Sequence, residues 1–194
     1  MTNAGQAGRP AGVAGRLVGM IMARLNADME HASVELLDLH GDEWALEIGY
    51  GPGIGISALL AALPNGRVCG IDPSPVMHRQ ASRRAGAAGR VDLRIGEVSS
   101  LPWPDAAFDG ILAVNNAQFW PDPGADVAEV LRVLAPGGRV VIALRTGRRY
   151  GHAQLATGCA ELLAGYGLDV AHDTRTMRTG PAVFLRGRRH WLVA

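Results

Sequence analysis

The chain has 194 residues, a formal net charge of +1 and two cysteines. This length fits one domain with a sizeable core, and the charged residues are spread along the chain, which argues against a binder of nucleic acid driven by charge. Cys69 and Cys159 have neither the spacing of metal ligands nor the density of a secreted disulfide scaffold, so we expect reduced thiols, as in a cytoplasmic protein, and no metal.

The first forty residues divide into a tail and a helical segment. Residues 1–10 are small and polar and are predicted to be disordered. Apolar residues at spacings of three and four over 13–25 and again over 34–37 predict two successive helices broken near Asn26. Two arginines interrupt the first run, so an amphipathic helix is a better interpretation than a signal peptide, and no stretch is long enough for membrane insertion.

After Gly41, short apolar runs alternate with helical ones, which is typical of a parallel sheet covered on both faces. The predicted strands are 44–48, 67–72, 90–96, 109–116, 139–145, 168–177 and 182–194. The predicted helices are 54–63, a segment that begins at Pro75 behind the N-cap Ser74, 123–134 and 152–166. This pattern predicts an α/β doubly wound fold with a seven-stranded, mostly parallel sheet that is closed by an antiparallel C-terminal hairpin. We expect a single domain over 11–194, with 11–40 as a helical cap and 44–194 as the core.

The stretch "ALEIGYGPGIGISALL" has glycine at every second position from Gly49 to Gly55. Glycine in the interior of an element costs roughly 0.5–1 kcal/mol relative to alanine, so these four need a reason. Gly49, Gly51 and Gly53 would let the chain turn tightly and bring N–H groups close to a ligand, beside the positive end of the next helix. Open α/β sheets bind ligands at this place, beyond the carboxyl end of the first strand.

An acidic residue follows at the end of the second predicted strand. Asp72 lies about twenty residues after the glycines, where a carboxylate can accept both hydroxyl hydrogens of a ribose. The ligand is therefore expected to be a nucleoside derivative. A nicotinamide dinucleotide fits less well, because G-x-G-x-x-G would need a glycine at Ile54, and the looser Gly53-x-Gly55-x-x-Ala58 begins late after the strand.

Four stretches occur in an order that is known from one enzyme family: "LEIGYGPGIG", "GIDPS", "GEVSSLPWPDAAFDGILAVNNAQFWPDP" and "LRVLAPGGRVVIA". They resemble the motifs of class I S-adenosylmethionine-dependent methyltransferases, specifically the small bacterial members of the ubiquinone/menaquinone-biosynthesis type. The resemblance covers Trp44 to Leu144. It implies a Rossmann-like fold, S-adenosylmethionine as cofactor with S-adenosylhomocysteine as product, and in-line transfer of a methyl group to a small organic acceptor.

The resemblance also implies a role for each matched position. Glu47 and the backbone from Gly49 to Gly53 would face the methionine part of the cofactor, and Asp72 would hold the ribose hydroxyls. Asn115 would lie near the cofactor's amino group and the transferred methyl. The other implied cofactor residues are Tyr50, the acidic Glu97 with Val98 at the adenine amino group, and Pro73 and Met77, which cover the adenine face or simply pack in the core. The sequence "NNAQ" departs from the motif of enzymes that methylate amino groups of nucleobases, so DNA is not the expected acceptor.

The acceptor side has weaker signals. A hydroxyl acceptor would be helped by a general base, for which His31 and His152, and less so His78, are candidates, each of them as easily an ordinary histidine. The loop after the fourth strand supplies acceptor-pocket candidates or residues packed on the N-terminal helices: Gln118, Phe119 and Trp120. A short connection after the fifth strand leaves almost no lid. The N-terminal helices or a second subunit in a homodimer would then cover the site, and its rim would carry Arg145, Arg148, Arg149 and Tyr150, which suggest an acidic acceptor unless they form a solvated loop.

Two other function classes remain open from the sequence. A binding or regulatory protein, or a non-methylating enzyme such as a cyclase, could keep the same cofactor site, and the lack of an evident base favours it. A nicotinamide-dependent reductase is disfavoured, because the chain has no lysine and therefore no Tyr-x-x-x-Lys pair.

Overall fold

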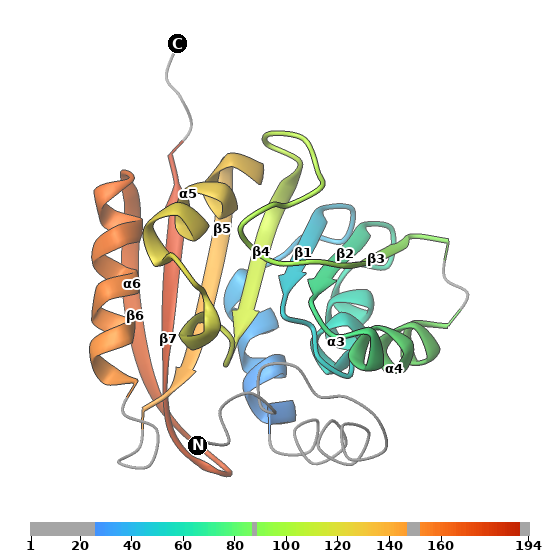
Figure 1. Cartoon of the computed structure of the whole chain (residues 1–194), viewed down its shortest axis with the longest axis horizontal. Helices are drawn as coiled ribbons and strands as arrows, with labels where there is room; N and C mark the ends of the chain where they lie inside the picture. The colour runs from blue at the N-terminus through green and yellow to red at the C-terminus, as the bar shows by residue number, and fades with distance from the viewer. Residues whose placement is uncertain (1–25, 87–88, 147–151, 191–194) are drawn as a thin grey trace.

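The computed structural model describes residues 26–86, 89–146 and 152–190. Its centre is a seven-stranded sheet in the order β3-β2-β1-β4-β5-β7-β6 (Figure 1). The strands are β1 (Trp44–Ile48), β2 (Arg67–Asp72), β3 (Val91–Ile95), β4 (Phe108–Val114), β5 (Leu134–Arg145), β6 (Leu168–Met177) and β7 (Gly180–Arg189). Only β7 runs against its neighbours β5 and β6. The predicted α/β fold with an antiparallel C-terminal hairpin is confirmed.

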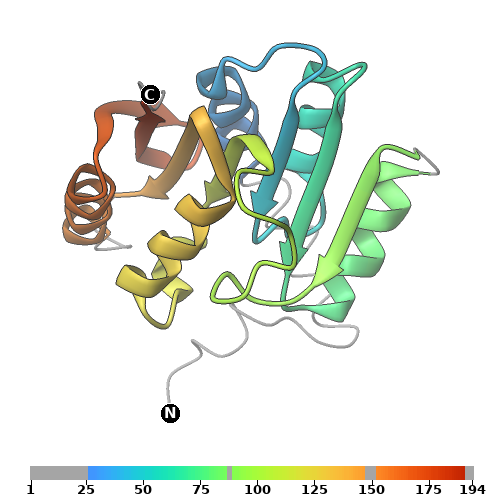
Figure 2. The same ribbon diagram turned by 90° about the horizontal axis from the view of Figure 1, so that it is seen from above.

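Helices cover both faces of the sheet. The described helices after β1 are α3 (Ile54–Ala62), α4 (Pro75–Ala85), α5 (Pro123–Val133) and α6 (Ala153–Gly165), with a short 3-10 turn η1 (Ala117–Phe119) after β4. Figure 2 shows α5 and α6 on one face, and α3, α4 and a helix over residues 26–37 on the other. We call the helix over 26–37 the N-terminal helix. Among the described residues no helix is both long and apolar enough to cross a membrane.

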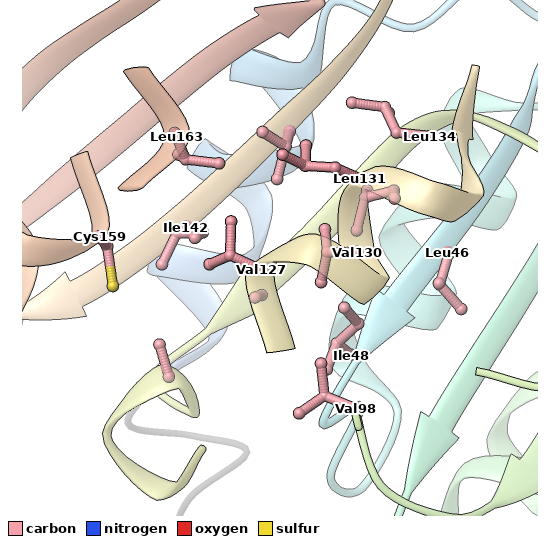
Figure 3. Packing of buried hydrophobic residues seen from close by; sticks show 14 of the residues in the cluster. Leu46, Ile48, Val98, Val127, Val130, Leu131, Leu134, Ile142, Cys159 and Leu163 are labelled. Carbon is pink, nitrogen blue, oxygen red and sulfur yellow. The ribbon is translucent and has the colours of Figure 1, made fainter. Parts of the chain in front are cut away.

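Each face has its own apolar core, because neighbouring side chains of a strand point to opposite faces. Leu46 and Ile48 of β1 pack with Val127, Val130 and other residues of α5 and α6 (Figure 3). Ala45 belongs to the other core, beneath α3 and the N-terminal helix. The same alternation puts Glu47 on the α3 face, where a carboxylate is out of place among apolar neighbours.

The N-terminal helix is part of this second core. Met29 and Leu37 are fully buried in it, and the side chain of Leu39 lies over Gly110 at the start of β4. Arg139 of β5 donates to the Asp38 carbonyl at 2.8 Å, just beyond the helix. The second of the two predicted N-terminal helices is thus present, whereas the expected tail at 1–10 and first helix at 13–25 lie outside the described residues.

The structure shifts one predicted boundary. The sequence places a turn at "APGG" between α5 and a strand beginning at Arg139, but β5 already begins at Leu134, directly after α5. Leu134 pairs with Phe108, and the next pair is Arg139 with Gly110, so the register shifts between them. The strand passes through the proline and glycines as an irregularity in its pairing with β4 rather than as a free loop.

The chain changes direction across the sheet between β1 and β4, which are parallel neighbours. At such a switch point the loops after the two strands part and leave a place for a ligand. Gly49 follows β1, Asp72 ends β2, Asn115 follows β4 and Arg145 ends β5. Four of the predicted site residues therefore come together at one edge of the sheet.

Candidate functional site

The loop after β1 and the end of β2 are joined through one carboxylate. Asp72 Oδ2 accepts from the Gly51 N–H at 2.9 Å, and Oδ1 accepts from the Ser74 N–H at 2.8 Å. The Gly49 N–H also donates to the Ile71 carbonyl at 2.8 Å. Asp72 is only 6% exposed. The two sequence features that predict a nucleoside site are thus in direct contact.

Opposing effects act on the pKa of the Asp72 carboxyl. Burial raises its pKa above the usual value, whereas the N–H groups of Ser74 and Gly51 and the nearby His78 lower it. Each carboxylate oxygen has two lone pairs, and the backbone N–H groups occupy one on each. The remaining lone pairs can accept the two hydroxyl hydrogens of a ribose, so this residue fits the nucleoside that the sequence predicts.

Of the glycines in this loop, Gly51 is the one that leaves room for a ligand. Its φ is +51°, a left-handed conformation that favours glycine. A Cβ added there would meet no atom within 4 Å. An open backbone position beside the Asp72 carboxylate is the cradle that a bound nucleoside derivative needs.

The other three glycines, Gly49, Gly53 and Gly55, make room for protein atoms. A Cβ on Gly49 would overlap the Asn116 side chain, and one on Gly53 would lie 2.9 Å from Ala81 of α4. A Cβ on Gly55 would overlap the Glu47 carboxylate. Gly53 and Gly55 of the looser dinucleotide match therefore lie against α4 and Glu47.

Asn115 joins three elements at the end of β4. Its Nδ2 donates to Asn26 Oδ1 of the N-terminal helix at 3.2 Å and contacts Met29 Sδ at 3.4 Å, and its Oδ1 accepts from the Arg145 N–H at 3.0 Å. Its φ is +49°, a conformation that asparagine tolerates better than most residues. The residue expected near the transferred methyl is therefore held from both sides.

Arg145 is buried instead of lying on a rim. It is 5% exposed, and its Nη2 donates to Asn26 Oδ1 at 2.8 Å. The N-terminal helix covers the end of β5, so the guanidinium is drawn into the Asn26 and Asn115 network. The other rim candidates, Arg148, Arg149 and Tyr150, lie outside the described residues.

Two buried carboxyl groups interact electrostatically beneath the loop that follows β1. Glu47 of β1 is 1% exposed and Glu30 of the N-terminal helix is 7% exposed. The Oε2 atom of each is buried without a hydrogen-bond partner in the described part of the chain. Burial raises the pKa of Glu30 to about 8. Burial, then the charges of Glu30 and Asp72, raise the pKa of Glu47 well above its usual value, against a hydrogen bond from the Ile56 backbone.

The predicted residues around the adenine have varied surroundings. The Tyr50 side chain is buried, and its hydroxyl donates to the Arg94 carbonyl at 3.1 Å and contacts His78 Nδ1 at 3.0 Å, so it fixes the loop from below. Other positions are Pro73, half-buried, Met77, buried at the start of α4, Glu97, exposed, and Val98, buried in the core under α5 and α6. Their roles toward the cofactor stay predictions.

The acceptor-side candidates do not form one cluster. His31 is exposed on the N-terminal helix, and His152 is half-buried immediately before α6. Gln118 donates to the Asn115 carbonyl at 2.8 Å, whereas Phe119 is 46% exposed. Trp120 packs in the core under α5 and α6, not against the N-terminal helix.

Sequence reasoning missed three residues of this region: Asn26, Glu30 and Asn116. Asn116 Nδ2 donates to the Ile48 carbonyl and so connects the end of β4 with the loop after β1. Asn26 and Glu30 share the buried helix face with Met29 and Leu37, at spacings of three, four and seven residues. Polar residues within an apolar helical stripe were the available signal.

The comparisons with known proteins agree with this geometry. Residues 46–142 match the model of a family described as "Methyltransferase domain". The chain is 30% identical over 129 residues to the uncharacterized methyltransferase YdaC of Bacillus subtilis. The matched stretch covers 66% of this chain and 71% of that protein. It is 39% identical over 124 residues to an uncharacterized 37.1 kDa protein in transposon Tn4556 of Streptomyces fradiae. This matched stretch covers 62% of this chain but only 36% of that protein.

Solved structures share the fold at low identity. A chain from the complex of the Haloferax volcanii Trm112 methyltransferase activator superposes with a TM-score of 0.76, at 19% identity, over 89% of this chain and 94% of that one. The [4+2]-cyclase SpnF superposes with a TM-score of 0.72, at 21% identity, over 87% of this chain and 82% of that one. The same architecture therefore serves more than one chemistry.

Proposed function

We propose that this chain, which belongs to the methyltransferase-domain family of class I S-adenosylmethionine-dependent enzymes, transfers a methyl group to a small organic acceptor by in-line displacement. The observation that carries the proposal is the contact between the buried Asp72 carboxylate and the Gly51 N–H, beside the open Cβ position of Gly51. This contact combines a hydroxyl acceptor and an exposed backbone at the switch point of the sheet.

The cofactor of this family is S-adenosylmethionine, which supplies an electrophilic methyl group on a positively charged sulfur. The residues present fit it. Asp72 would hold the ribose hydroxyls, and the backbone around Gly51 would lie against the cofactor. Glu47, which is buried below the loop and has an unpartnered oxygen, would place a carboxyl group on the side of the methionine part.

The protein's task in such a reaction is alignment. Positive charge disappears from sulfur as the methyl moves, so no nucleophilic side chain is needed and the rate depends on holding donor and acceptor in line. Asn115 and Arg145 are held by hydrogen bonds with Asn26 at the ends of β4 and β5. We assign this fixed cluster to the acceptor side, with Gln118 and Phe119 beside it, and we retain His31 and His152 as candidate bases for a hydroxyl acceptor.

The proposal extends to the setting of the enzyme. The acceptor is a small molecule and not a nucleic acid, and a second copy of the chain could complete the acceptor side as a homodimer. The buried free thiols Cys69 and Cys159 are in keeping with a reducing, cytoplasmic compartment.

Calorimetric titration with S-adenosylmethionine tests the cofactor site. We expect wild-type binding, and a loss of about 10- to 100-fold in affinity for Asp72→Ala, because hydrogen bonds to a charged group contribute about 1.5–3 kcal/mol. Glu161→Ala is the matched control, since Glu161 is exposed on α6, far along the chain from the site. Thermal melting checks that both proteins are folded. Equal affinity of wild type and Asp72→Ala for S-adenosylmethionine would then contradict the assignment.

The second test separates methyl transfer from binding alone. Wild-type protein is incubated with S-adenosylmethionine and a panel of hydroxyl, amine and carboxylate acceptors, and mass spectrometry detects products heavier by one methylene unit. A methylated product with release of S-adenosylhomocysteine supports the proposal. Tight binding with no methylated product across the panel would favour the alternative, a cofactor-binding protein or a non-methylating enzyme such as a cyclase, whose fold this chain also shares.

A further inference from the structure

We propose that Glu30 is a further cofactor-binding residue, which forms with Glu47 a two-carboxyl site for a primary ammonium group and releases a proton when that group binds. The inference rests on the proposed function, because the ammonium group is that of the methionine part of S-adenosylmethionine. Glu30 lies outside the stretch from 46 to 142 that matches the family model. Its role is therefore a feature of the N-terminal helix.

The site is built from two elements that meet under the glycine loop. Glu47 comes from β1, and its carboxylate lies against Gly55 at the start of α3. Glu30 comes from the N-terminal helix, one turn after Asn26, which is held at the ends of β4 and β5. Ser33, one turn further on the same helix face, is fully buried.

Three oxygen atoms of this site have no partner. Glu30 Oε2, Glu47 Oε2 and Ser33 Oγ are buried and accept or donate no hydrogen bond within the described part of the chain. A buried polar atom without a partner costs free energy, about 1–3 kcal/mol and more for a charged group. Three such atoms on two packed elements indicate a missing partner.

That partner must be positively charged or bring protons. Two interacting carboxylates in a buried place cannot both stay ionised without a cation. No ion pair connects Glu30 or Glu47 to a basic side chain among the residues that the structure describes. Two arginines of β5 are engaged elsewhere, Arg145 with Asn26 and Arg139 with Glu43. Without a cation, burial therefore favours protonation of this pair.

A primary ammonium fits the vacant acceptors better than a metal ion does. It has three N–H donors, enough to reach the unpartnered oxygens of both Glu30 and Glu47. Ca²⁺ takes six to eight oxygen ligands, and within the described ranges no group of three or more histidine, cysteine or acidic residues could hold a metal ion. The chemistry therefore favours the ammonium group.

Other titratable groups around the pair modulate it. Asp72 at the end of β2 adds negative charge that disfavours ionisation of Glu47, and the buried Tyr50 hydroxyl lies in the same layer. His78 of α4 contacts Tyr50 and lowers the pKa of Asp72. Burial raises the pKa of Glu30 to about 8 and also raises the pKa of Glu47, so burial favours the protonated form of each carboxyl. When an ammonium arrives, one carboxyl ionises against it and its proton passes to the solvent.

The experiment is calorimetry at pH 7 in two buffers that differ in ionisation enthalpy, which counts protons released on binding. We expect about one proton per S-adenosylmethionine, and none for 5′-methylthioadenosine, which lacks the ammonium group. Affinity for S-adenosylmethionine should rise by up to about tenfold per pH unit below pH 8, the slope for one released proton, and level off above it.

Glu30→Gln should release less proton and bind S-adenosylmethionine at least tenfold more weakly, while 5′-methylthioadenosine binds as in wild type. Glu35→Gln is the control, since Glu35 is exposed on the same helix, and Glu47→Gln is a second test of the pair. Wild-type binding without proton release, or unchanged release and affinity in Glu30→Gln, would overturn this inference alone. No wild-type binding of either compound would overturn the proposed function instead.

Discussion

Asn115 and Asn116 show how much of this site depends on single side chains. The two adjacent amides face different elements: Asn115 bonds to the N-terminal helix and β5, and Asn116 to the Ile48 carbonyl of β1. The left-handed backbone at Asn115 permits this divergence within two residues. Gly49 has no Cβ because the Asn116 side chain occupies that place. One residue thus links the end of β4 to the predicted cofactor loop.

Asn116→Ala should therefore loosen that loop. The Ile48 carbonyl loses its side-chain donor, and we expect a loss of about 1–3 kcal/mol in the free energy of unfolding, together with weaker cofactor binding. Urea unfolding measures the first effect and calorimetry the second. Asn65→Ala, at an exposed position in the turn before β2, should change neither. A stable Asn116→Ala protein with wild-type affinity would show that the loop holds its shape without this amide.

Glu30 should make the stability of the free protein depend on pH. Its folded pKa of about 8 lies above the ordinary glutamate pKa of 4.5, so between these values the folded state binds more protons than the unfolded state. The stability that the protonated carboxyl contributes is fully present below the lower value and is lost as pH rises through the higher one, by at most about 1.4 kcal/mol per pH unit. Urea unfolding from pH 5 to 9 should show this decline in wild type and in Glu35→Gln, and a weaker one in Glu30→Gln. Equal slopes in all three would contradict it.

Among the elements, α3 and α6 show that glycine has opposite meanings in two helices. Gly55 lies in the first turn of α3, where a Cβ would meet the Glu47 carboxylate. Gly158 lies inside α6, where a Cβ would meet no atom within 4 Å. Gly55 must be glycine because Glu47 of β1 occupies the place of a Cβ. Nothing around Gly158 requires glycine.

Alanine at these two positions should change stability in opposite directions. Gly158→Ala should stabilise the protein by about 0.4–1 kcal/mol, because alanine reduces the freedom of the unfolded chain. Gly55→Ala should destabilise it by about 1–3 kcal/mol, because the new methyl group overpacks the contact with Glu47. Thermal or urea unfolding of both variants checks this. A neutral Gly55→Ala would mean that the Glu47 carboxylate moves aside at little cost.

On the scale of the whole molecule, the N-terminal helix belongs to the core as well as to the site. It buries Met29 and Leu37 against the face that α3 covers, while Asn26 reaches the ends of β4 and β5. The segment predicted as a cap over the acceptor is thus continuous, in its described part, with the packing of the sheet. Removing it would uncover one face of the fold.

Deletion of residues 1–39 should accordingly abolish cooperative unfolding and not merely acceptor turnover. The smaller change Met29→Ala should cost about 2–5 kcal/mol, the range for truncating a fully buried methionine. Deletion of residues 2–10, the tail predicted to be disordered, should leave the urea midpoint unchanged. If the protein without residues 1–39 still unfolds cooperatively near the wild-type midpoint, the N-terminal helix is not required for the core. It would then be only a detachable cap over the site.

The sequence by itself determined the order of strands and helices, the antiparallel hairpin, and the places of Gly51 and Asp72, because hydrophobic periodicity and glycine spacing are local properties of the chain. It also carried the family's motifs between β1 and β5. Only the tertiary structure decided which atoms those local features meet. The absence of a Cβ makes room for Asn116 at Gly49, for Ala81 at Gly53 and for Glu47 at Gly55.

The same reason explains why the proximity of Glu30 to Glu47 and the burial of Arg145 could not be predicted from the sequence. Glu30 stands 17 positions before Glu47, and Asn26 stands 119 positions before Arg145. Whether such residues meet depends on how the N-terminal helix docks on the sheet, and docking is set by the shape of the buried face as a whole. Burial and charge pairing are properties of that packed surface, so no short stretch of chain encodes them.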